Sequence, residues 1–414
     1  MEDEQDDKHQ GQFSLFEGDL VNRAFAKLGI GARKPLDLLA RIVLLIGITW
    51  CPMAVMASFT VIPDALPEDA RIAMNFFYDF AAYTQFFIGL PLFIIAEKIL
   101  SDNILAAARD FEGSGIVSAQ DRPKLRAIED EVARLRRKAS PEIICFIIAF
   151  VLSLMTIGPE LFWPGDAMQT WHVAKDPVSH ARNFTMTGAW ETFVALPIQI
   201  FWWVRWIWKI GLWYWYLRQV SKFKLVLVAS HPDHTGGIGF LSETQAKFAI
   251  VILAFGVSNI VSTIGYKIAV EHAPLDLPPV WGPVVGFVIG APLIFLSPLL
   301  LFTKQLARTK KRAMDQFRER AMAAALRVEE QWLNSRCAND ECDVNARGEL
   351  SQLNLLSGFY DRIHGMRVIP FDLRSALQLT GSAVGPMIPL LPYFVKLPEP
   401  WQAILEAMTK WLPH

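Results

Sequence analysis

Cysteine is scarce in this 414-residue chain, and its placement excludes a disulfide-stabilised scaffold. Of the four cysteines, Cys51 and Cys145 lie inside apolar runs, whereas Cys337 and Cys342 lie in a charged segment. We therefore expect reduced thiols. The Cys-x4-Cys spacing of the second pair also differs from the Cys-x2-Cys pairs that structural zinc sites use.

The chain also lacks the signatures of several enzyme classes. It has no Walker motif, no nucleophile elbow and no HExxH sequence, which disfavours a known hydrolase or an ATP-driven pump. None of its eight histidines lies inside a membrane-length apolar run, which disfavours a bis-histidine haem bundle. We expect no cofactor and favour a non-enzymatic role.

The N-terminal region has none of the features of a secretory signal peptide. Residues 1–20 contain seven acidic residues and one lysine, and no apolar core that a translocon would read. We expect a partly disordered, acidic tail in the cytoplasm.

What the chain has in abundance is apolar sequence. Hydrophobic residues make up 52% of it, with 14 Trp and 28 Phe, and the mean hydropathy is +0.28. A helix needs about 20 apolar residues to cross a bilayer. Six runs approach this length: 42–62, 72–96, 143–158, 192–217, 248–270 and 281–302.

Basic residues divide the segments between these runs into two groups. The segments 63–71, 164–189 and 271–280 together hold only Arg71, Lys175 and Arg182. By contrast, 99–141 holds eight basic residues, 218–247 holds four and 303–376 holds thirteen. The positive-inside rule therefore places the basic segments and both ends of the bundle in the cytoplasm.

These patterns predict an all-α membrane protein with six transmembrane helices, cytoplasmic N and C termini and helical cytoplasmic extensions. The divisions that we expect are an acidic tail (1–37), transmembrane helices 1–2 (38–98), a cytoplasmic helical hairpin (99–141), transmembrane helices 3–4 (142–217), a cytoplasmic glycine loop (218–246), transmembrane helices 5–6 (247–302), a cytoplasmic helical region (303–374) and a C-terminal segment (375–414).

The C-terminal segment departs from the six-helix pattern. Residues 375–395 are apolar but contain two glycines and three prolines, which predicts a re-entrant or interfacial segment rather than a seventh crossing. Residues 401–412 carry apolar side chains at helical spacing, as in a helix that lies in the membrane interface.

The segment after the last apolar run predicts one long helix. Residues 303–335 contain no Gly or Pro and are rich in Ala, Arg, Glu and Gln. A thin seam of small residues favours contact with a sister subunit in a homo-oligomer. The basic residues at its start are typical of a belt near anionic lipid headgroups, and we expect no nucleic-acid partner.

Polar residues inside the apolar runs are candidates for function, because burying them in lipid is costly. Asn75, Asp79 and Tyr83 follow one helical spacing, and so do Asn259, Thr263 and Lys267. Asp79 and Lys267 lie at similar depth, which predicts a contact between them. It is either a structural ion pair or part of a conduction or coupling path.

The fourth run carries Arg205 near its middle and Lys209 one turn further on, among six tryptophans. In one interpretation Lys209 reaches the headgroups and Arg205 stacks on indole rings. In the other, the two cations form a positively charged constriction or binding site for an anion or an anionic lipid.

The sequence HPDHTGGIGFL at residues 231–241 allows three interpretations. His231, Asp233 and His234 are metal-ligand types, and whether they bind a metal stays open. Gly236, Gly237 and Gly239 before a helix are typical of a phosphate cradle. The interpretation that we favour is a structural turn, because Pro-Asp and glycine residues adopt turn conformations readily. Either way these six residues are candidates for ligand binding or gating.

Two further features concern the surroundings of this loop. Ser242 and Gln245 match a capping box that would start the fifth helix. The runs KLVLVAS and MRVIPF are strand-like, and their pairing would join the glycine loop to the C-terminal segment.

HPDHTGGIGFL resembles an HPDxxGGxGFL pattern found in uncharacterised bacterial multi-pass inner-membrane proteins. RVIPFDLRSALQL followed by PLLP resembles their C-terminal part. The resemblance implies a location in the bacterial inner membrane and brings no activity with it.

Together these observations predict an oligomeric channel or permeation pathway for ions or small solutes, with anions as one option. The alternative is a non-transporting sensor or scaffold that binds a cytoplasmic partner or anionic lipid through the glycine loop and the basic helix. A third option is a membrane enzyme that uses His231, Asp233 and His234 on a lipid-linked substrate.

Overall fold

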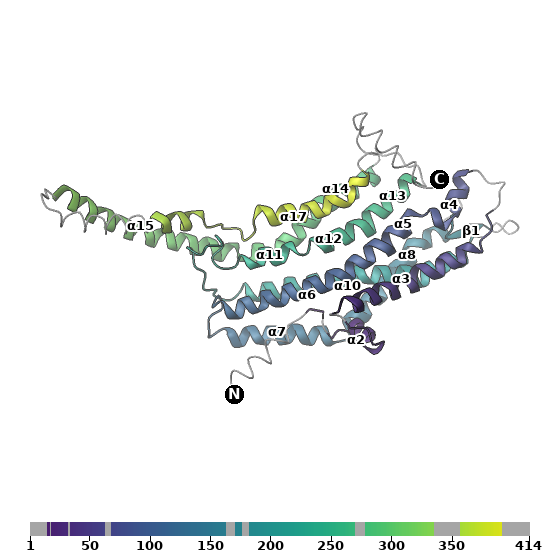
Figure 1. The fold of residues 1–414 in the computed structure, drawn as a ribbon, viewed down its shortest axis with the longest axis horizontal. Coiled ribbons are helices and arrows are strands. Elements are labelled where there is room, and N and C mark those ends of the chain that lie inside the picture. Colours follow the sequence, from purple (N-terminus) through teal and green to yellow (C-terminus); the bar gives the residue numbers. More distant parts are fainter. Residues whose placement is uncertain are drawn as a thin grey trace, which may run out of the picture.

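The computed structural model shows an elongated bundle of helices (Figure 1). It describes residues 15–16, 18–31, 34–62, 68–162, 170–175, 182–269, 278–334 and 357–390. Most helix axes run along the length of the molecule. We call the end from which α15 (Thr303–Asn334) projects the α15 end, and the opposite end, which carries the β1–β2 hairpin, the hairpin end.

Among the described residues, four helical stretches are long and apolar enough to cross a membrane: Pro35–Ser58, Phe80–Gly113, Phe240–Gly265 and Gly282–Arg327. A fifth is added if the pair Arg122–Arg137 and Ser140–Thr156, which is bent by 49°, counts as one broken span. The chain is therefore a helical protein built to lie in a membrane.

The fourth apolar run forms one helix, α10 (Leu196–Val220), but that helix is absent from the four stretches above. Arg205 and Lys209 and the many tryptophans, which are less hydropathic than aliphatic residues, lower its mean hydropathy. Arg205 and Lys209 are nonetheless buried by protein, so one face of α10 lies in the interior of the bundle.

The second apolar run is not one continuous helix, contrary to the prediction. α4 (Glu68–Met74) ends before Asn75, a 3-10 turn η1 (Phe76–Tyr78) follows, and α5 (Phe80–Tyr83) starts after Asp79. Asn75 accepts a hydrogen bond from the Phe77 backbone N–H, and Asp79 accepts one from that of Ala81. Both residues act as caps, as Asn and Asp favour, and their extended backbones break the helix.

Three of the apolar helices contain a π-helical segment: η2 (Thr84–Gly89), η3 (Glu191–Ala195) and η4 (Gly256–Val261). η2 and η4 lie side by side, and a Cβ added to Gly89 would lie 2.5 Å from the Ser258 Cβ. Glycine is needed at that crossing. π-Helical turns widen a helix locally and occur often at functional sites.

A helical hairpin and a β-hairpin lie at opposite ends of the bundle. At the α15 end, α6 (Leu90–Gly113) continues beyond its apolar part, and α7 (Arg122–Arg137) folds back before α8 (Ser140–Phe162), as the expected helical hairpin does. At the other end, β1 (Val173–Lys175) pairs antiparallel with β2 (Arg182–Phe184) and leads into α9 (Met186–Trp190).

The remaining described helices complete the bundle. They are α2 (Leu20–Lys27), α3 (Pro35–Ser58), α11 (Phe240–Ala246), α12 (Ala249–Phe255), α13 (Ser262–Ala269), α14 (Pro278–Leu296), η5 (Ser297–Phe302), α17 (Leu373–Val384) and η6 (Gly385–Leu390), and residues 357–365 are also helical. α15 is a single helix of 32 residues, as its composition predicts, and it projects beyond the bundle (Figure 1).

The start of the C-terminal segment is helical and packs within the bundle. α17 lies along α14 and α12 (Figure 1). A Cβ added to Gly256 in η4 would lie 2.9 Å from Pro386 in η6, so the two segments meet closely. The described part is therefore a packed helix, and the predicted amphipathic tail at 401–412 lies outside the described residues, as do Cys337 and Cys342.

Candidate functional site

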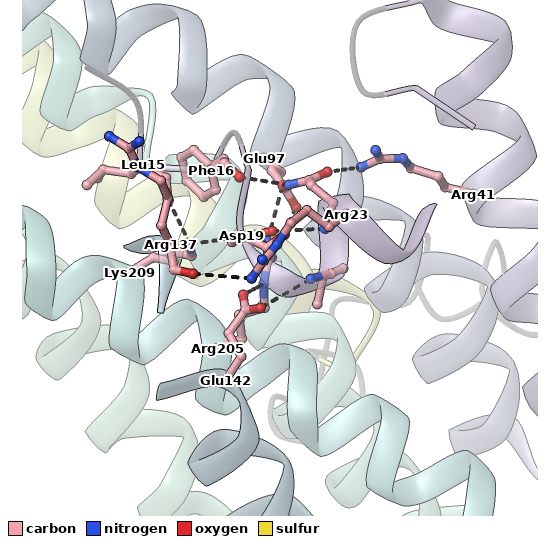
Figure 2. Close-up of polar contacts among 12 residues, drawn as sticks. Leu15, Phe16, Asp19, Arg23, Arg41, Glu97, Arg137, Glu142, Arg205 and Lys209 are labelled. Atoms are coloured by element: carbon pink, nitrogen blue, oxygen red, sulfur yellow. Dashed lines mark hydrogen bonds and ion pairs between the residues drawn. The ribbon is translucent and has the colours of Figure 1, made fainter. Parts of the chain in front are cut away.

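A group of buried charges lies where five segments of the chain meet (Figure 2). We call it the charge cluster, and its members are Asp19, Arg41, Glu97, Glu142, Arg205 and Lys209. All six are at most 6% exposed. Burial of a charge in a membrane protein is costly unless the charge has partners, so the partners of each member are described in turn.

Arg205 is the centre of the cluster and is completely buried. Its Nη2 lies 2.6 Å from the Asp19 Oδ2, its Nη1 lies 3.0 Å from the Glu97 Oε2, and its Nε lies 3.0 Å from the Glu142 Oε1. The guanidinium group therefore donates to three carboxylates that come from three different segments. Its carbon also lies 5.0 Å from the Trp202 ring centroid, in agreement with the predicted stacking on indole.

Lys209 lies four residues further along α10, on the same helical face. Its Nζ donates to the Leu15 carbonyl oxygen at 2.6 Å and to the Asp19 Oδ2 at 2.9 Å. The side chain is 2% exposed, so it does not extend to lipid headgroups as one interpretation proposed. Both partners of the ammonium group belong to the segment that precedes α2.

Asp19 serves two purposes with its two oxygens. Oδ1 accepts the Asn22 backbone N–H at 2.9 Å and so caps α2, while Oδ2 accepts from Arg205 and Lys209. This division satisfies the carboxylate completely, as burial requires. The local sequence fits, since aspartate is a favoured N-cap residue.

Asn22 connects Arg41 to the rest of the cluster. Its Nδ2 donates to the Glu97 Oε1 at 2.6 Å, and its Oδ1 accepts from the Arg41 Nη1 at 2.6 Å. Arg41 also lies over the Phe25 ring at 4.6 Å. Three cations and three carboxylates are thus balanced by charge, which explains how the protein tolerates them in its interior.

The structure gathers Arg205 and Lys209 with residues that the sequence interpretation did not single out. Arg41, Glu97 and Glu142 flank the first, second and third apolar runs, where charges normally mark the ends of spans. A signal was available, because these three positions lie at one end of the bundle by the predicted topology. Nothing local in the N-terminal tail indicated that Asp19 would be buried.

A second polar group lies nearer the hairpin end and contains Asp79. Its Oδ2 accepts from the Trp171 Nε1 at 3.0 Å. The His172 Nε2 lies 2.9 Å from the Glu191 Oε2, and Trp171 and His172 are in ring contact. Asp79 therefore uses an indole on the segment before β1, and the Lys267 side chain of the predicted ion pair lies outside the described residues.

The predicted face of Asn75, Asp79 and Tyr83 does not form, because the helix breaks at the first two. Asp79 is buried, whereas Tyr83 packs against Trp50 with ring centroids 5.8 Å apart, and Asn75 is partly exposed. These residues are caps and packing groups rather than one polar stripe.

The face of Asn259, Thr263 and Lys267 is not the buried one. Thr263 is exposed and Asn259 is half-buried, while Ser258 and Ser262 are completely buried. Ser258 accepts from the Trp203 Nε1 at 3.1 Å, and Ser262 accepts from the Gln85 Nε2 at 3.2 Å. The packing of η4 against η2 therefore places Ser258 and Ser262, rather than Asn259 and Thr263, in the interior.

Between the two polar groups lies Gln199, another residue that the sequence interpretation did not single out. It is completely buried, and its amide makes no hydrogen bond to any described residue. Ala195 and Trp202, one turn to either side, pack in interior clusters, so Gln199 lies on the same interior face. A buried amide without a partner costs free energy and is a feature that needs an explanation.

The glycine loop is organised by Asp233. Its carboxylate accepts from the backbone N–H groups of Thr235 at 2.8 Å, Gly237 at 3.0 Å and Gly239 at 2.9 Å. Gly236 and Gly237 have φ of 72° and 100°, conformations that favour glycine. The loop is therefore a structural turn, the interpretation that the sequence favoured.

Burial raises the pKa of Asp233, but the backbone donors and His231 outweigh it, and the net pKa is about 2. His231 lies 2.8 Å from Asp233. His234 has φ of 56° and its carbonyl accepts the Arg367 N–H at 2.7 Å. The amides that would cradle a phosphate are already used by the protein's own carboxylate.

Two predictions about the loop's surroundings are wrong in detail. α11 starts after Gly239, so Ser242 and Gln245 lie inside it and form no capping box; Ser242 instead bonds Ser375 at 3.0 Å. The two strand-like runs do not form strands. The Val226 backbone N–H donates instead to the Ile116 carbonyl oxygen. The loop is joined to the C-terminal segment, but through Arg367 and His234.

Among the described residues, no three His, Cys, Asp or Glu side chains converge in a group that could hold a metal ion. The charge cluster instead combines carboxylates with cations that neutralise them. Arg205 and Lys209 have carboxylate partners, whereas Arg41 is joined to the cluster through the Asn22 amide.

No protein-family model, no curated protein and no solved structure matches the chain. The resemblance to bacterial inner-membrane proteins with the HPDxxGGxGFL motif therefore stays a prediction. The function must be argued from the geometry alone.

Proposed function

We propose that the protein is a membrane permeation pathway for ions or small solutes, and that the pathway follows the interior face of η3 and α10. The observation that carries this proposal is a series of buried polar residues on that face: Glu191, Gln199, Arg205 and Lys209. In a membrane protein, buried polar residues in an apolar bundle mark ion or substrate paths by default.

The broken helices support the same proposal. The second apolar run is interrupted at Asn75 and Asp79, and η2, η3 and η4 replace regular helix in three elements of the bundle. Irregular backbone at membrane depth is tolerated where it lines a protein interior or cavity, and interrupted helices are typical of transport proteins.

In this proposal the described arrangement is a closed one. Met53, Phe76, Phe86, Trp171 and Ala195 pack together between Gln199 and the hairpin end. The charge cluster closes the other side. The positive-inside rule supports a cytoplasmic α15 end, and the HPDxxGGxGFL resemblance supports the inner membrane of a bacterium. In this orientation the charge cluster is the cytoplasmic barrier.

Flux through liposomes tests the proposal. Purified protein is expected to increase leak of a small anion or cation above that of protein-free liposomes. Gln199→Leu is expected to lower this flux about tenfold, because it removes the polar group at the centre of the pathway. Ile207→Ala, at a residue of the same helix that is 61% exposed, is the matched control and leaves flux unchanged.

Either of two results would reject the pathway: no ion or solute passes through the purified protein, or Gln199→Leu leaves the flux unchanged as Ile207→Ala does. A second candidate function then gains weight, a sensor or scaffold that binds anionic lipid or a cytoplasmic partner. The projection of α15 beyond the bundle favours it, with Lys304, Lys311 and Arg312 exposed near its start. Cosedimentation with vesicles of anionic lipid, lost on neutralising these three residues, measures that candidate.

A further inference from the structure

Three residues that precede α2 are buried within the bundle. Leu15 and Phe16 are 1% and 2% exposed, and Asp19 is completely buried. The segment continues into α2, which lies near α3 and one end of α7 (Figure 1). We call residues 15–27 the N-terminal segment.

Many polar contacts of this segment are made to charged side chains of the bundle. Lys209 donates to the Leu15 carbonyl and to Asp19, and Arg205 donates to Asp19. The Val21 backbone N–H donates to the Glu142 Oε2 at 3.1 Å. Figure 2 shows these groups converging around Asp19 from several helices. The segment is therefore held by ion pairs and hydrogen bonds to the charge cluster.

The charges of the bundle are unbalanced without this segment. Arg41, Arg205 and Lys209 face only Glu97 and Glu142, which leaves one positive charge in excess. Arg205 keeps two carboxylates, at 3.0 Å each, whereas both described polar partners of Lys209 lie in the segment. A buried ammonium group without a partner is strongly unfavourable. An anion bound in the place of Asp19 would restore the balance of charge when the segment leaves.

We propose that the N-terminal segment is a removable plug, and that the site it occupies between Lys209 and Arg205 takes a small monovalent carboxylate when the plug withdraws. One excess positive charge selects one negative charge. The two donors that hold the Asp19 carboxylate, a guanidinium N–H and an ammonium N–H, bind a free carboxylate in the same way. Asp19 is thus an intramolecular competitor of that anion.

This inference deepens the proposed function, on which the gating role of the plug rests. The plug closes the α15 end of the pathway, and the competing anion opens it. The binding step and the withdrawal step can be measured without any flux.

Cys145 supplies a reporter for plug withdrawal. It lies three residues after Glu142 on the same helical face and is 5% exposed. In full-length protein in detergent, with Cys51, Cys337 and Cys342 replaced by serine, the rate at which a small anionic methanethiosulfonate modifies Cys145 reports access to the cluster. We expect slow modification of this parent protein.

Asp19→Asn should increase the modification rate about tenfold, because it removes the charge-assisted hydrogen bonds that hold the plug. Sodium acetate should lower the rate in this variant at concentrations where the larger divalent anion sulfate does not. Asp19→Glu keeps the carboxylate and is expected to stay near the parent rate. Circular dichroism checks that each variant keeps its helix content.

A cross-link distinguishes plug withdrawal from loosening of the whole bundle. Arg23 Nη2 donates to the Arg137 carbonyl at 3.2 Å, and both residues are exposed. A short bismaleimide between Arg23→Cys and Arg137→Cys therefore ties α2 to α7. In the Asp19→Asn background it should return Cys145 to the parent rate, whereas each single cysteine should not.

Two results would overturn the proposal: an Asp19→Asn rate equal to that of the parent, or a raised rate that the cross-link leaves unchanged. If Asp19→Asn does not fold, the cross-link in the parent protein decides, because it must lower the parent rate further. Liposome flux separates the two ideas. Absent flux with the expected Cys145 results rejects the pathway and keeps the plug, and the reverse pattern rejects the plug alone.

Discussion

The glycine loop and the charge cluster both hold a buried or half-buried aspartate, yet they are built in opposite ways. Asp233 is satisfied by donors from residues two, four and six positions further along the chain. Asp19 caps α2 with one oxygen, but its other oxygen is bound by side chains 186 and 190 residues away. The first is a local turn whose motif is visible in the sequence, and the second exists only after five segments have packed together.

This difference shows that a conspicuous motif is not evidence for a ligand site. HPDHTGGIG contains ligand-type residues and glycines, but the carboxylate of Asp233 consumes the amide donors that a phosphate needs. The charge cluster has no motif, yet it places ion pairs in the interior of a membrane bundle. Function in this protein is better sought where the long-range contacts are.

The strongest test of the comparison is Arg205→Ala. It leaves three buried carboxylates without their common cation, and we expect a loss of about 3–5 kcal/mol in the free energy of unfolding. Thermal unfolding in detergent measures it. Arg218→Ala, at an exposed arginine on the same helix, is the control with about 0.5 kcal/mol or less. Equal shifts for the two variants would show that the cluster contributes nothing.

A contact between residues 87 positions apart in the sequence joins α7 to α10: the Tyr216 hydroxyl donates to the Glu129 Oε1 at 3.2 Å. Burial, with Glu112 nearby, raises the pKa of Glu129 to about 7. The folded state thus favours the protonated form, so this stabilisation is complete below about pH 4.5 and disappears as the pH rises through 7.

Glu129→Gln is therefore expected to stabilise the protein by about 1–3 kcal/mol at pH 8 and to change little at pH 5. Unfolding curves at the two pH values measure the effect. Glu131→Gln on the same helix is the matched control. A Glu129→Gln effect that is equal at both would contradict the assignment.

The smallest effect is expected in the glycine loop. Asp233→Ala removes the acceptor of three backbone donors and should cost about 1–2 kcal/mol, confined to the loop and its contact with Arg367. Hydrogen exchange at the Gly237 and Gly239 amides should accelerate while amides of α10 stay protected. Exchange that accelerates equally in α10 would mean that the loop supports the whole fold.

The pH dependence of the loop has the opposite sign to that of Glu129. The pKa of Asp233 is lowered from 3.8 to about 2, so its stabilisation is fully present above about pH 4 and is lost as the pH falls through 2. Loop amides should therefore stay protected at pH 4. If they lose protection between pH 5 and 4, the hydrogen bonds of Asp233 are weaker than the structure indicates.

Local sequence patterns predicted the parts of the fold that depend on neighbouring residues. α15 follows from a run without Gly or Pro, and the turn at 231–239 follows from Pro-Asp and glycines. The second apolar run shows the limit of this approach, since hydropathy predicted one helix. Asn75 and Asp79 lie within an apolar run of the sequence, but in the structure they cap short helices. The indole of Trp171 that donates to Asp79 comes from a distant segment.

Arg205 illustrates what a pattern leaves open. Its place in a tryptophan-rich run suggested stacking, which the contact with Trp202 bears out, but a positively charged constriction or anion site was the alternative that the sequence left open. Its three carboxylate partners lie 63, 108 and 186 residues away. No local pattern can identify partners at such separations.

The sequence by itself determined that this chain is a helical membrane protein, because apolar runs of bilayer length and a helix-favouring composition are local properties. It also determined the turn of the glycine loop, since glycine and aspartate act through their own backbones. Only the tertiary structure decided that Asp19 neutralises Arg205 and Lys209 and that Gln199 is buried without a partner among the described residues. The reason is physical: the cost of burying a charge depends on which groups meet it, and that is set by packing between distant segments.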